Sequence, residues 1–388
     1  MPDALAGRIW DRLQSLKDAG LERSLRAPSG IDLSSNDYLG LSADPRVTRA
    51  MIDAVARGGA GSTGSRLLRG ERTAFAEVER KFAAFKGTER ALYFSSGYLA
   101  NLAVLTALAE KDDVIFSDAL NHASLIDGVR LSHADYVIFS HSDVASLEPL
   151  IAQHSAEKQA FIVTESLFSM DGDIAPLTGY ASVCRATGAA LIVDEAHAVG
   201  VRGRRGSGLL EEAGLDPNSC ISINTAGKAL GVSGAFVAGP EWAIDYLIQR
   251  ARPFIFSTAP PPSIASALIA SLDIIDQEPE RRTRLASRVS RLQQALDAHG
   301  LAIPCGPSHI VPVVIGDNTR AVAAADALQA QGFDVRAIRP PSVPAGTSRL
   351  RLAVNAMLDD ATIDRFAAAL ANVFRTVLLA SPSSMVEG

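Results

Sequence analysis

The stretch AALIVDEAHAVG, residues 189–200, decides how the middle of the chain folds. It begins as an uninterrupted run of apolar, strand-forming residues and changes abruptly to Asp194, Glu195 and His197. Strands that are apolar on both faces are typical of a parallel sheet covered by helices on both sides. Ligands of such sheets bind at the carboxyl ends of the strands. We therefore expect Asp194 and His197 to lie at a ligand site.

Six further runs of the same kind lie on either side of this one. They are ALYFS (91–95), DVIFS (113–117), DYVIFS (135–140), AFIVTE (160–165), CISIN (220–224) and GAFVAG (234–239). Several of them are separated by helical patterns, at residues 98–109, 122–132 and 176–187. The alternation predicts an α/β fold whose large domain is built on a mainly parallel, seven-stranded sheet covered by helices.

The pattern changes after FSTAPPPS (256–263). Helical patterns at 263–277 and 279–299 lead into strand-like segments, and a last helical pattern begins near residue 359. The strand-like segments are HIVPVVIG (309–316), DVRAI (334–338) and RLRLAV (349–354). This change indicates a smaller C-terminal α+β domain.

By these patterns the 388 residues divide into an N-terminal helical arm (1–45), a large domain (46–275) and a small domain (276–388). Hydrophobic residues make up 47% of the chain and charged residues 21%, as in an ordinary soluble globular enzyme. The formal net charge is −6, and no run of lysines and arginines is present. These features argue against a nucleic-acid partner.

Cysteines, histidines and apolar segments indicate the compartment and exclude some kinds of site. The cysteines form no C-x-x-C pair, which fits a reducing compartment without disulfides or a zinc knuckle; they are Cys184, Cys220 and Cys305. Three histidines lie among polar residues, and we interpret them as surface residues rather than metal ligands: His133, His141 and His154. The chain has no apolar stretch long enough to cross a bilayer and no signal-peptide core. We expect a cytoplasmic protein without a membrane partner.

The letters D-E-A-H also occur in nucleic-acid helicases, where the carboxylates hold Mg²⁺ and a nucleotide. Such a site needs a phosphate loop of the form G-x-x-x-x-G-K followed by Ser or Thr. In SINTAGKAL (222–230), Ser222 stands at the first glycine position and Ala229 at the hydroxyl position. The other glycine cluster, GGAGSTGSR (58–66), contains no lysine. The sequence therefore argues against a nucleotide site.

Lys228 suggests a different chemistry. It follows the strand-like CISIN and is flanked by small residues in NTAGKALG (224–231). A lysine amine can form a Schiff base with a carbonyl cofactor, above all pyridoxal 5′-phosphate (PLP). This cofactor also needs an acid at its pyridine nitrogen, a partner for its phenolic oxygen, a group stacked on its ring and a phosphate cradle.

Each of these needs has a candidate residue in the sequence. Asp194 can hold the pyridine nitrogen protonated, and His197 can bind the phenolic oxygen. In FSSGYLAN (94–101), Gly97 opens a helix whose backbone N–H groups can bind phosphate. His122 follows the next strand and can cover the ring. Each residue alone is a weak signal, but the phosphate turn, histidine, aspartate and lysine each follow a different predicted strand.

With these residues the chain resembles the α-oxoamine synthases, PLP-dependent enzymes of fold type I. The resemblance extends over nearly the whole chain, in LSSNDYLGL (33–41), GSTGSRLLRG (61–70), FSSGYLAN (94–101), DALNHASL (118–125), TESLFSMDGD (164–173), VDEAHAVG (193–200), NTAGKALG (224–231), FSTAPPP (256–262) and RPPSVPAGTSRLRL (339–352). It implies a PLP-dependent transferase fold of type I and a homodimer. It also implies an active site at the subunit interface, with GSTGSRLLRG near the partner's cofactor.

The resemblance also implies roles for individual residues. Lys228 would bind the cofactor covalently, and Asp194 would pair with its pyridinium. The other cofactor contacts implied are Gly97, Tyr98 and Thr225 at the phosphate, Ser169 and His197 at the phenolic oxygen, and His122 on the ring. The substrate contacts implied are Arg23, His122, Ser342 and Arg351, with Arg351 binding the amino-acid carboxylate through its planar fork. Lys228, His122 and Asp194 would be the catalytic residues, without a metal.

Members of this family join a small amino acid to an acyl thioester and lose CO₂. RPPSVPAGTSRLRL with NDYLGL (36–41) favours the members that condense L-alanine with pimeloyl-CoA or a pimeloyl-acyl carrier protein in biotin synthesis. The alternatives are 2-amino-3-ketobutyrate CoA ligase, 5-aminolevulinate synthase, a bacterial serine palmitoyltransferase and, outside the family, an aminotransferase of the same fold. Three residues depart from the family pattern: Glu71 and Phe75 replace an asparagine and a histidine, and Asn224 replaces a glycine.

Overall fold

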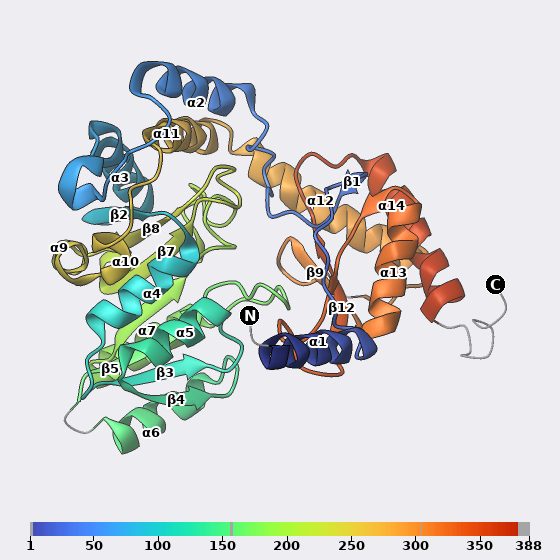
Figure 1. Ribbon diagram of the computed structural model, residues 1–388, viewed down its shortest axis with the longest axis horizontal. Coiled ribbons are helices and arrows are strands. Elements are labelled where there is room, and N and C mark those ends of the chain that lie inside the picture. Colours follow the sequence, from blue (N-terminus) through green and yellow to red (C-terminus); the bar gives the residue numbers. More distant parts are fainter. Residues whose placement is uncertain (1–2, 156–157, 304, 379–388) are drawn as a thin grey trace. The chain divides into compact units, whose positions relative to one another are not determined.

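A computed structural model describes residues 3–155, 158–303 and 305–378 (Figure 1). These residues form two compact units. The larger unit comprises Asn36–Ser169 and Asp173–Arg284. The smaller unit comprises the residues up to Ser35, Met170–Gly172 and the residues from Leu285 onward. The units do not follow the division into 1–45, 46–275 and 276–388 position by position, and that division stays a proposal.

The larger unit is built on a seven-stranded sheet in the order β2-β8-β7-β6-β5-β3-β4. The strands are β2 (Arg90–Phe94), β3 (Val114–Asp118), β4 (Asp135–Phe139), β5 (Ala160–Glu165), β6 (Ala190–Asp194), β7 (Cys220–Thr225) and β8 (Ala235–Gly239). Strand β8 is antiparallel to its neighbours β2 and β7, and the other neighbouring pairs are parallel. All seven predicted strands and the mainly parallel sheet are confirmed.

The strand order places the carboxyl ends of β5, β6 and β7 side by side. Strand β3 lies between β4 and β5, so the chain leaves β3 toward one edge and returns on its other side. Ligands bind at such a reversal, outside the carboxyl ends of the strands. Glu165 pairs in register with Asp194, and Asp194 pairs with Ile223. The ends of three strands therefore lie at one level of the sheet.

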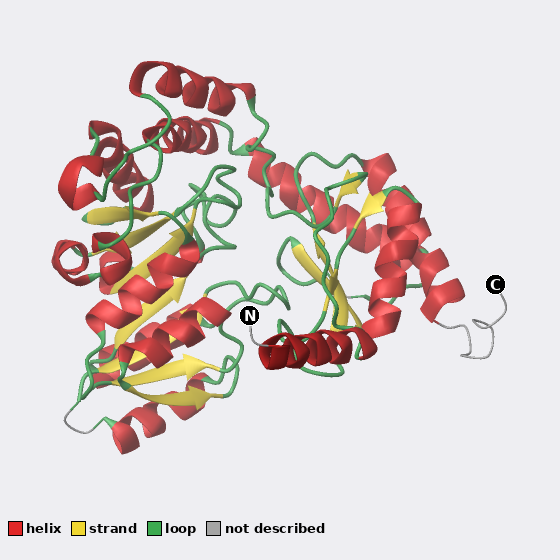
Figure 2. Ribbon diagram, viewed as in Figure 1, coloured by secondary structure: helices red, strands yellow, loops and turns green. Residues whose placement is uncertain are grey.

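Helices surround this sheet, as Figure 2 shows in red around the yellow strands. They are α2 (Pro45–Gly58), α3 (Thr73–Lys86), α4 (Gly97–Leu108), α5 (Ala123–Ser132), α6 (Val144–His154), α7 (Leu177–Thr187), α8 (Leu209–Glu212), α9 (Glu241–Arg250), α10 (Arg252–Ile255) and α11 (Pro262–Gln277), with short turns at Arg66–Gly70 and Pro217–Ser219. Helix α12 (Glu280–Ala298) passes from the larger unit into the smaller one.

Helix α4 is central to the core of the larger unit. It is apolar all round, as expected of a buried helix, and it contacts β7, β8 and α5. Gly128 of α5 allows the close approach of the two helices, since a Cβ atom there would lie 2.7 Å from Leu105 Cδ1. Ser96 begins α4 by accepting a hydrogen bond from Leu99 N at 3.2 Å, as N-cap serines do. Packing and capping thus fix the first turn of α4 against the sheet.

The smaller unit contains two sheets. Strands β11 (Ala337–Ile338), β12 (Ser348–Ala353) and β9 (Ile310–Gly316) form an antiparallel sheet, and β1 (Ile31–Asp32) pairs in parallel with β10 (Phe333–Asp334). Its helices are α1 (Asp3–Asp18), α13 (Asn318–Ala330) and α14 (Asp360–Val373), followed by a π-helical turn at Phe374–Leu378. The predicted α+β character is confirmed.

DVRAI (334–338) does not form the single strand predicted for it. Its first residue belongs to β10 and its last two to β11, because β10 pairs with β1 whereas β11 pairs with β12. The backbone turns between them, with Val335 N donating to Phe333 O at 3.1 Å. A short apolar run gave no sign of this division, since the pairing partners lie far away in the sequence.

His141 is not the surface residue expected from the sequence. Its side chain is half-buried, with Nδ1 2.9 Å from Asp118 Oδ1 and Nε2 2.7 Å from Asp173 Oδ2. His133 and His154 are exposed, as predicted. Among the described residues, no group of three or more histidine, cysteine or acidic side chains could hold a metal ion. None of the described helices is both long and apolar enough to cross a membrane.

Candidate active site

A cavity of about 190 Å³ in the larger unit lies at the carboxyl ends of β5, β6 and β7 and the first turn of α4. Seven of the residues predicted from the sequence line it: Gly97, Tyr98, His122, Asp194, His197, Thr225 and Lys228. Asn101, Ser124, Glu165 and Ala196 complete the lining. Ser169 lies next to this group, with its backbone N donating to Glu165 Oε2 at 3.3 Å. The fold therefore brings the predicted cofactor contacts together.

Asp194 is the last residue of β6 and is held by two neutral donors. Its Oδ2 accepts a hydrogen bond from Asn101 Nδ2 at 2.7 Å, and its Oδ1 accepts one from Ala196 N at 2.8 Å. Asn101 Nδ2 is itself close to Ser124 Oγ, at 2.8 Å. Hydrogen bonds from neutral donors stabilise the charged form of a carboxylate. Asp194 is thus oriented and suited to act as an anion in the cavity.

Lys228 and His197 form a hydrogen-bonded chain that leads away from the cavity. Lys228 Nζ lies 2.8 Å from His197 Nε2, and His197 Nδ1 lies 2.7 Å from the hydroxyl of Tyr38. The Tyr38 hydroxyl donates to Asn36 Oδ1 at 2.8 Å. With its own proton directed to Asn36, the hydroxyl accepts from Nδ1–H, which leaves Nε2 to accept from the Lys228 amine. The chain therefore selects one histidine tautomer.

His122 precedes the first turn of α5. Its Nδ1 accepts a hydrogen bond from Ser124 N at 3.3 Å and lies 2.7 Å from Ser124 Oγ. Desolvation by the surrounding atoms lowers the pKa of His122; the charge of Asp194 raises it, and the charge of Lys228 lowers it further. The net lowering of the pKa favours a neutral imidazole at neutral pH, with Nδ1 as an acceptor.

The start of α4 forms a cradle for an anion. A Cβ atom at Gly97 would lie 2.5 Å from Thr225 Oγ1, so this position requires the absence of a side chain. The first N–H groups of a helix have no intrahelical partners and attract phosphate. Tyr98 is exposed, and its hydroxyl bonds to Asp127. Gly97, the Thr225 hydroxyl and the first N–H groups of α4 thus fit a phosphate group.

Taken together, the residues fit PLP. The cavity offers an anionic carboxylate, an imidazole and an amine at strand ends, together with a phosphate cradle at Gly97. Two buried oxygens in the same cavity, Asn101 Oδ1 and Glu165 Oε1, have no hydrogen-bond partner among the described residues. Buried polar groups without a hydrogen-bond partner are expected where a polar ligand binds.

Asn101, Glu165 and Tyr38 are residues of this region that the sequence analysis did not single out. A signal was present for two of them. Asn101 lies one turn after Gly97 and so on the same face of the predicted helix. Glu165 ends a predicted strand, as Asp194 does. Tyr38 gave no such local signal, because its contact with His197 joins residues 159 positions apart.

Three predicted substrate contacts belong to the smaller unit. Arg351 lies in β12 opposite Pro312 of β9. Arg23 Nη2 donates to Pro340 O at 2.8 Å, and Ser342 N donates to Arg339 O at 3.1 Å. Their roles toward a substrate stay predictions.

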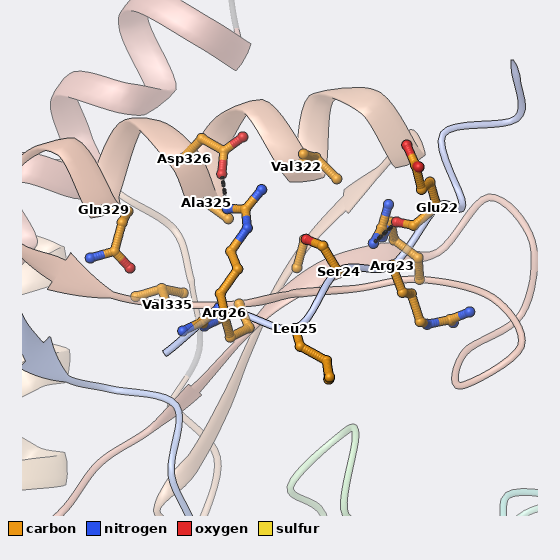
Figure 3. Close-up of a pocket in the computed structure, with 13 residues that line it drawn as sticks. Glu22, Arg23, Ser24, Leu25, Arg26, Val322, Ala325, Asp326, Gln329 and Val335 are labelled. Carbon is orange, nitrogen blue, oxygen red and sulfur yellow. Dashed lines mark hydrogen bonds and ion pairs between the residues drawn. The ribbon is translucent and has the colours of Figure 1, made fainter. Parts of the chain in front are cut away.

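Arg23 lines a separate cavity of about 380 Å³ in the smaller unit (Figure 3). Figure 3 shows Arg26 pairing with Asp326 of α13, at 2.7 Å. Burial lowers the pKa of Arg339, and the charges of Arg23 and Arg26 lower it further. The cavity therefore gathers positive charge, of which the Asp326 carboxylate offsets only a part.

Known proteins are similar to this one over most of the chain. A family described as aminotransferase class I and II matches residues 28–370. An 8-amino-7-oxononanoate synthase of Anaeromyxobacter sp. (strain K) is 47% identical over 388 residues, covering 96% of this chain and 97% of that protein. Proteins of the same name from Anaeromyxobacter dehalogenans (strain 2CP-C) and Marinobacter nauticus are 50% and 43% identical, covering 94% and 92% of this chain and 95% and 94% of theirs.

Solved structures are similar over most of the chain. A serine palmitoyltransferase from S. paucimobilis with a bound PLP–myriocin aldimine has a TM-score of 0.88 at 32% identity, covering 95% of this chain and 97% of that one. An 8-amino-7-oxononanoate synthase from Francisella tularensis has a TM-score of 0.77 at 30% identity, covering 89% and 98%. These similarities confirm the fold class that the sequence predicted.

Proposed function

Because the chain belongs to the aminotransferase class I and II family, and within it to the PLP-dependent α-oxoamine synthases, we propose that it condenses L-alanine with a pimeloyl thioester. The products are 8-amino-7-oxononanoate, CO₂ and free CoA or acyl carrier protein. The observation that carries this proposal is the single cavity in which Lys228, Asp194, His197 and Gly97 meet. The names of relatives that are 43–50% identical support the product, and the resemblance to the α-oxoamine synthases supports the substrates.

PLP is the proposed cofactor. When bound, it draws electrons from the α-carbon of an attached amino acid. Lys228 would hold it covalently, Asp194 would keep a proton on its pyridine nitrogen, and Ser169 and His197 would contact its phenolic oxygen. The first turn of α4 with Thr225 would receive its phosphate.

Lys228 also acts as the general base in this proposal. With the cofactor and L-alanine bound, the Lys228 amine would take the α-proton of L-alanine. His197 is in position to orient that amine, since its Nε2 lies 2.8 Å from Lys228 Nζ. The Tyr38 hydroxyl and Asn36 in turn orient the imidazole. A base held by a fixed imidazole acts from one position, which is the geometric requirement of proton transfer.

His122 and the arginines complete the proposed reaction. The α-carbon would bond to the thioester carbonyl carbon as the thiolate leaves, the amino-acid carboxylate would depart as CO₂, and Lys228 would return the proton it had taken to the α-carbon. His122 would cover the cofactor ring and bond to the carboxylate or the developing oxyanion. Arg351 would bind the carboxylate of the amino acid, and Arg23 and Ser342 would be further substrate contacts.

A substrate panel tests the proposed reaction. Purified protein is incubated with PLP and L-alanine, glycine or L-serine, each with pimeloyl-, acetyl-, succinyl- or palmitoyl-CoA, and CoA release and ketone product are measured. We expect the highest kcat/KM for L-alanine with pimeloyl-CoA. A preference for glycine would favour a ligase or 5-aminolevulinate synthase activity, and a preference for L-serine with palmitoyl-CoA would favour sphingolipid synthesis. Amino transfer to an α-keto acid would identify an aminotransferase.

Two further parts of the proposal concern partners and place. We infer a homodimer in the cytoplasm, from the resemblance to the α-oxoamine synthases, with GSTGSRLLRG (61–70) near the partner's cofactor. Sedimentation of an active monomer would contradict the dimer. Whether the acyl donor is CoA or a carrier protein is tested by comparing kcat/KM for the two pimeloyl thioesters.

A further inference from the structure

Two carboxyl groups end neighbouring strands of the sheet. Glu165 is the last residue of β5 and Asp194 the last of β6, and the two residues pair in register between parallel strands. Residues paired in this way direct their side chains to the same face of a sheet. Both line the cavity of about 190 Å³. The structure therefore places two acidic groups at the same level of one buried site.

The two carboxyl groups have unequal partners. Both Asp194 oxygens accept hydrogen bonds, from Asn101 Nδ2 and Ala196 N. Glu165 Oε2 accepts a long hydrogen bond of 3.3 Å from Ser169 N, and the backbone N–H of His122 also donates to the carboxyl group. Glu165 Oε1 has no partner in the described part of the chain, although the side chain is buried. The environment thus stabilises a charge on Asp194 and leaves one on Glu165 poorly solvated.

The charges around Glu165 do not reverse this difference. From β6 it faces Asp194 and from the turn after β7 it faces Lys228. The His122 imidazole, whose pKa is lowered, lines the same cavity. Lys228 is the cation of this set, and its Nζ lies 2.8 Å from His197 Nε2.

We propose that Glu165 is a neutral carboxylic acid in the folded protein and presents its O–H to the cavity, while Asp194 carries the negative charge. Two neighbouring carboxyl groups in one site separate into an acid and an anion because both cannot ionise without strong repulsion. Burial raises the pKa of Glu165 from 4.5 to about 8; the charge of Asp194 raises it and that of Lys228 lowers it. The site then holds one anion and one hydrogen-bond donor at the same level.

The consequence for catalysis rests on the proposed function. A neutral Glu165 can donate to an acceptor oxygen of the bound cofactor or substrate, where an ionised carboxylate would repel it. The protonation state itself can be measured on the protein without cofactor. A protonated Glu165 in a protein that binds no PLP would contradict the proposed function but not this inference. An ionised Glu165 in a protein that binds PLP would contradict this inference but not the proposed function.

Infrared difference spectroscopy of the cofactor-free protein tests the protonation state. We expect a carboxylic-acid C=O band at pH 6.5 in the wild type that is absent in Glu165→Gln, since the amide keeps the shape but has no acid proton. Glu148→Gln is the matched control, because Glu148 is exposed, and it should keep the band. A wild-type spectrum at pH 6.5 without a carboxylic-acid band sensitive to Glu165→Gln would overturn the proposal.

A second variant keeps the proposal falsifiable if Glu165→Gln does not fold. In Asp194→Asn the neighbouring charge is gone, so the carboxylic-acid band should disappear at lower pH than in the wild type. An unchanged titration midpoint would contradict the proposed interaction between the two carboxyl groups.

Stability gives an independent readout, because between its ordinary and its raised pKa a carboxyl group keeps its proton in the folded protein and loses it in the unfolded chain. Wild-type stability should therefore fall between about pH 4.5 and 8 relative to Glu165→Gln, and parallel curves would contradict the proposal.

Discussion

Asp194 and Glu195 are adjacent in the sequence, but their carboxylates lie in different environments. Asp194 lines the cavity around Lys228, whereas Glu195 forms a buried ion pair with Lys86. Asp194 faces the cavity and is bound by neutral donors. Glu195 forms an ion pair with Lys86, and both side chains are almost completely buried. Lys86 Nζ also donates to Ser207 O at 2.6 Å, and Leu210 N donates to Glu195 Oε1 at 3.0 Å.

The difference lies in how much hydrogen-bonding capacity each region leaves unused. Around Glu195 both carboxylate oxygens and the lysine are bonded within the protein. Gly208 leaves room for this pair, since a Cβ atom there would lie 2.5 Å from Glu195 Oε1. In the cavity, Asn101 Oδ1 and Glu165 Oε1 are unpaired in the described structure. In a region that stabilises the fold, the buried polar groups form hydrogen bonds with one another. In a binding site, some buried polar groups have no protein partner and can bond to the ligand.

Removing Lys228 should have the largest effect on function. We expect Lys228→Ala to lose bound PLP, seen as loss of its visible absorbance, and to lower kcat by more than the roughly 10²–10⁴-fold contribution of a positioned base. Lys111→Ala, at an exposed turn, is the control and should keep both. Wild-type absorbance in Lys228→Ala would show that another residue binds the cofactor.

Removing Lys86 should have the largest effect on stability. Lys86→Met leaves the buried Glu195 carboxylate without its cation, which costs about 3–5 kcal/mol in the free energy of unfolding. Urea denaturation measures this difference. Lys81→Met on the same helix removes an ion pair with Asp273 that is partly exposed, and it should cost less than about 1 kcal/mol. Equal costs for the two variants would contradict the structural role given to the buried pair.

Filling the cradle at Gly97 should have a smaller and more selective effect. In Gly97→Ala the new methyl group would overlap Thr225 Oγ1, and relief of such crowding costs about 1–3 kcal/mol. We expect the Kd for PLP to rise by about tenfold or more, as measured by titration of the cofactor-free protein. Gly58→Ala, at a helix position with open space, is the control. If Gly97→Ala bound PLP as tightly as Gly58→Ala, the phosphate cradle would lie elsewhere.

The smallest expected effect concerns His141 outside the cavity. Burial lowers the pKa of His141, but the hydrogen bonds to Asp118 and Asp173 outweigh it and raise the pKa above 6.5. The charged histidine therefore contributes stability that is complete below pH 6.5 and is lost as the pH rises through the raised pKa. We expect the urea midpoints of wild type and His141→Asn to converge as the pH rises from 6 to 9.

The exposed His133 provides the control for this experiment. His133→Asn should follow the wild-type curve throughout the pH range. A constant difference between wild type and His141→Asn would mean that His141 does not titrate in this range. The pKa of His122 in the cavity is shifted in the opposite direction.

Much of the fold and of the candidate site could be predicted because their signals are local. An apolar run followed by a polar residue marks the end of a buried strand, as at Asp194, and seven such runs gave the sheet. Lys228 lies in the turn after β7 and Gly97 is the first residue of α4, and small residues nearby make both positions recognisable. The prediction of one strand at DVRAI was wrong because two short strands with different partners look like one continuous strand in the sequence.

The sequence by itself determined the seven strands of the large sheet, their carboxyl ends and the residues proposed to bind PLP. Tertiary structure decided which polar groups are satisfied. Asn101 bonds to Asp194 across 93 positions, and Lys86 pairs with Glu195 across 109. It also placed Glu165 beside Asp194, and burial and neighbouring charge set the pKa of a carboxyl group more than its identity does. Periodicity reports which face of an element is buried, but the protonation of a buried acid depends on neighbours that only the fold assembles.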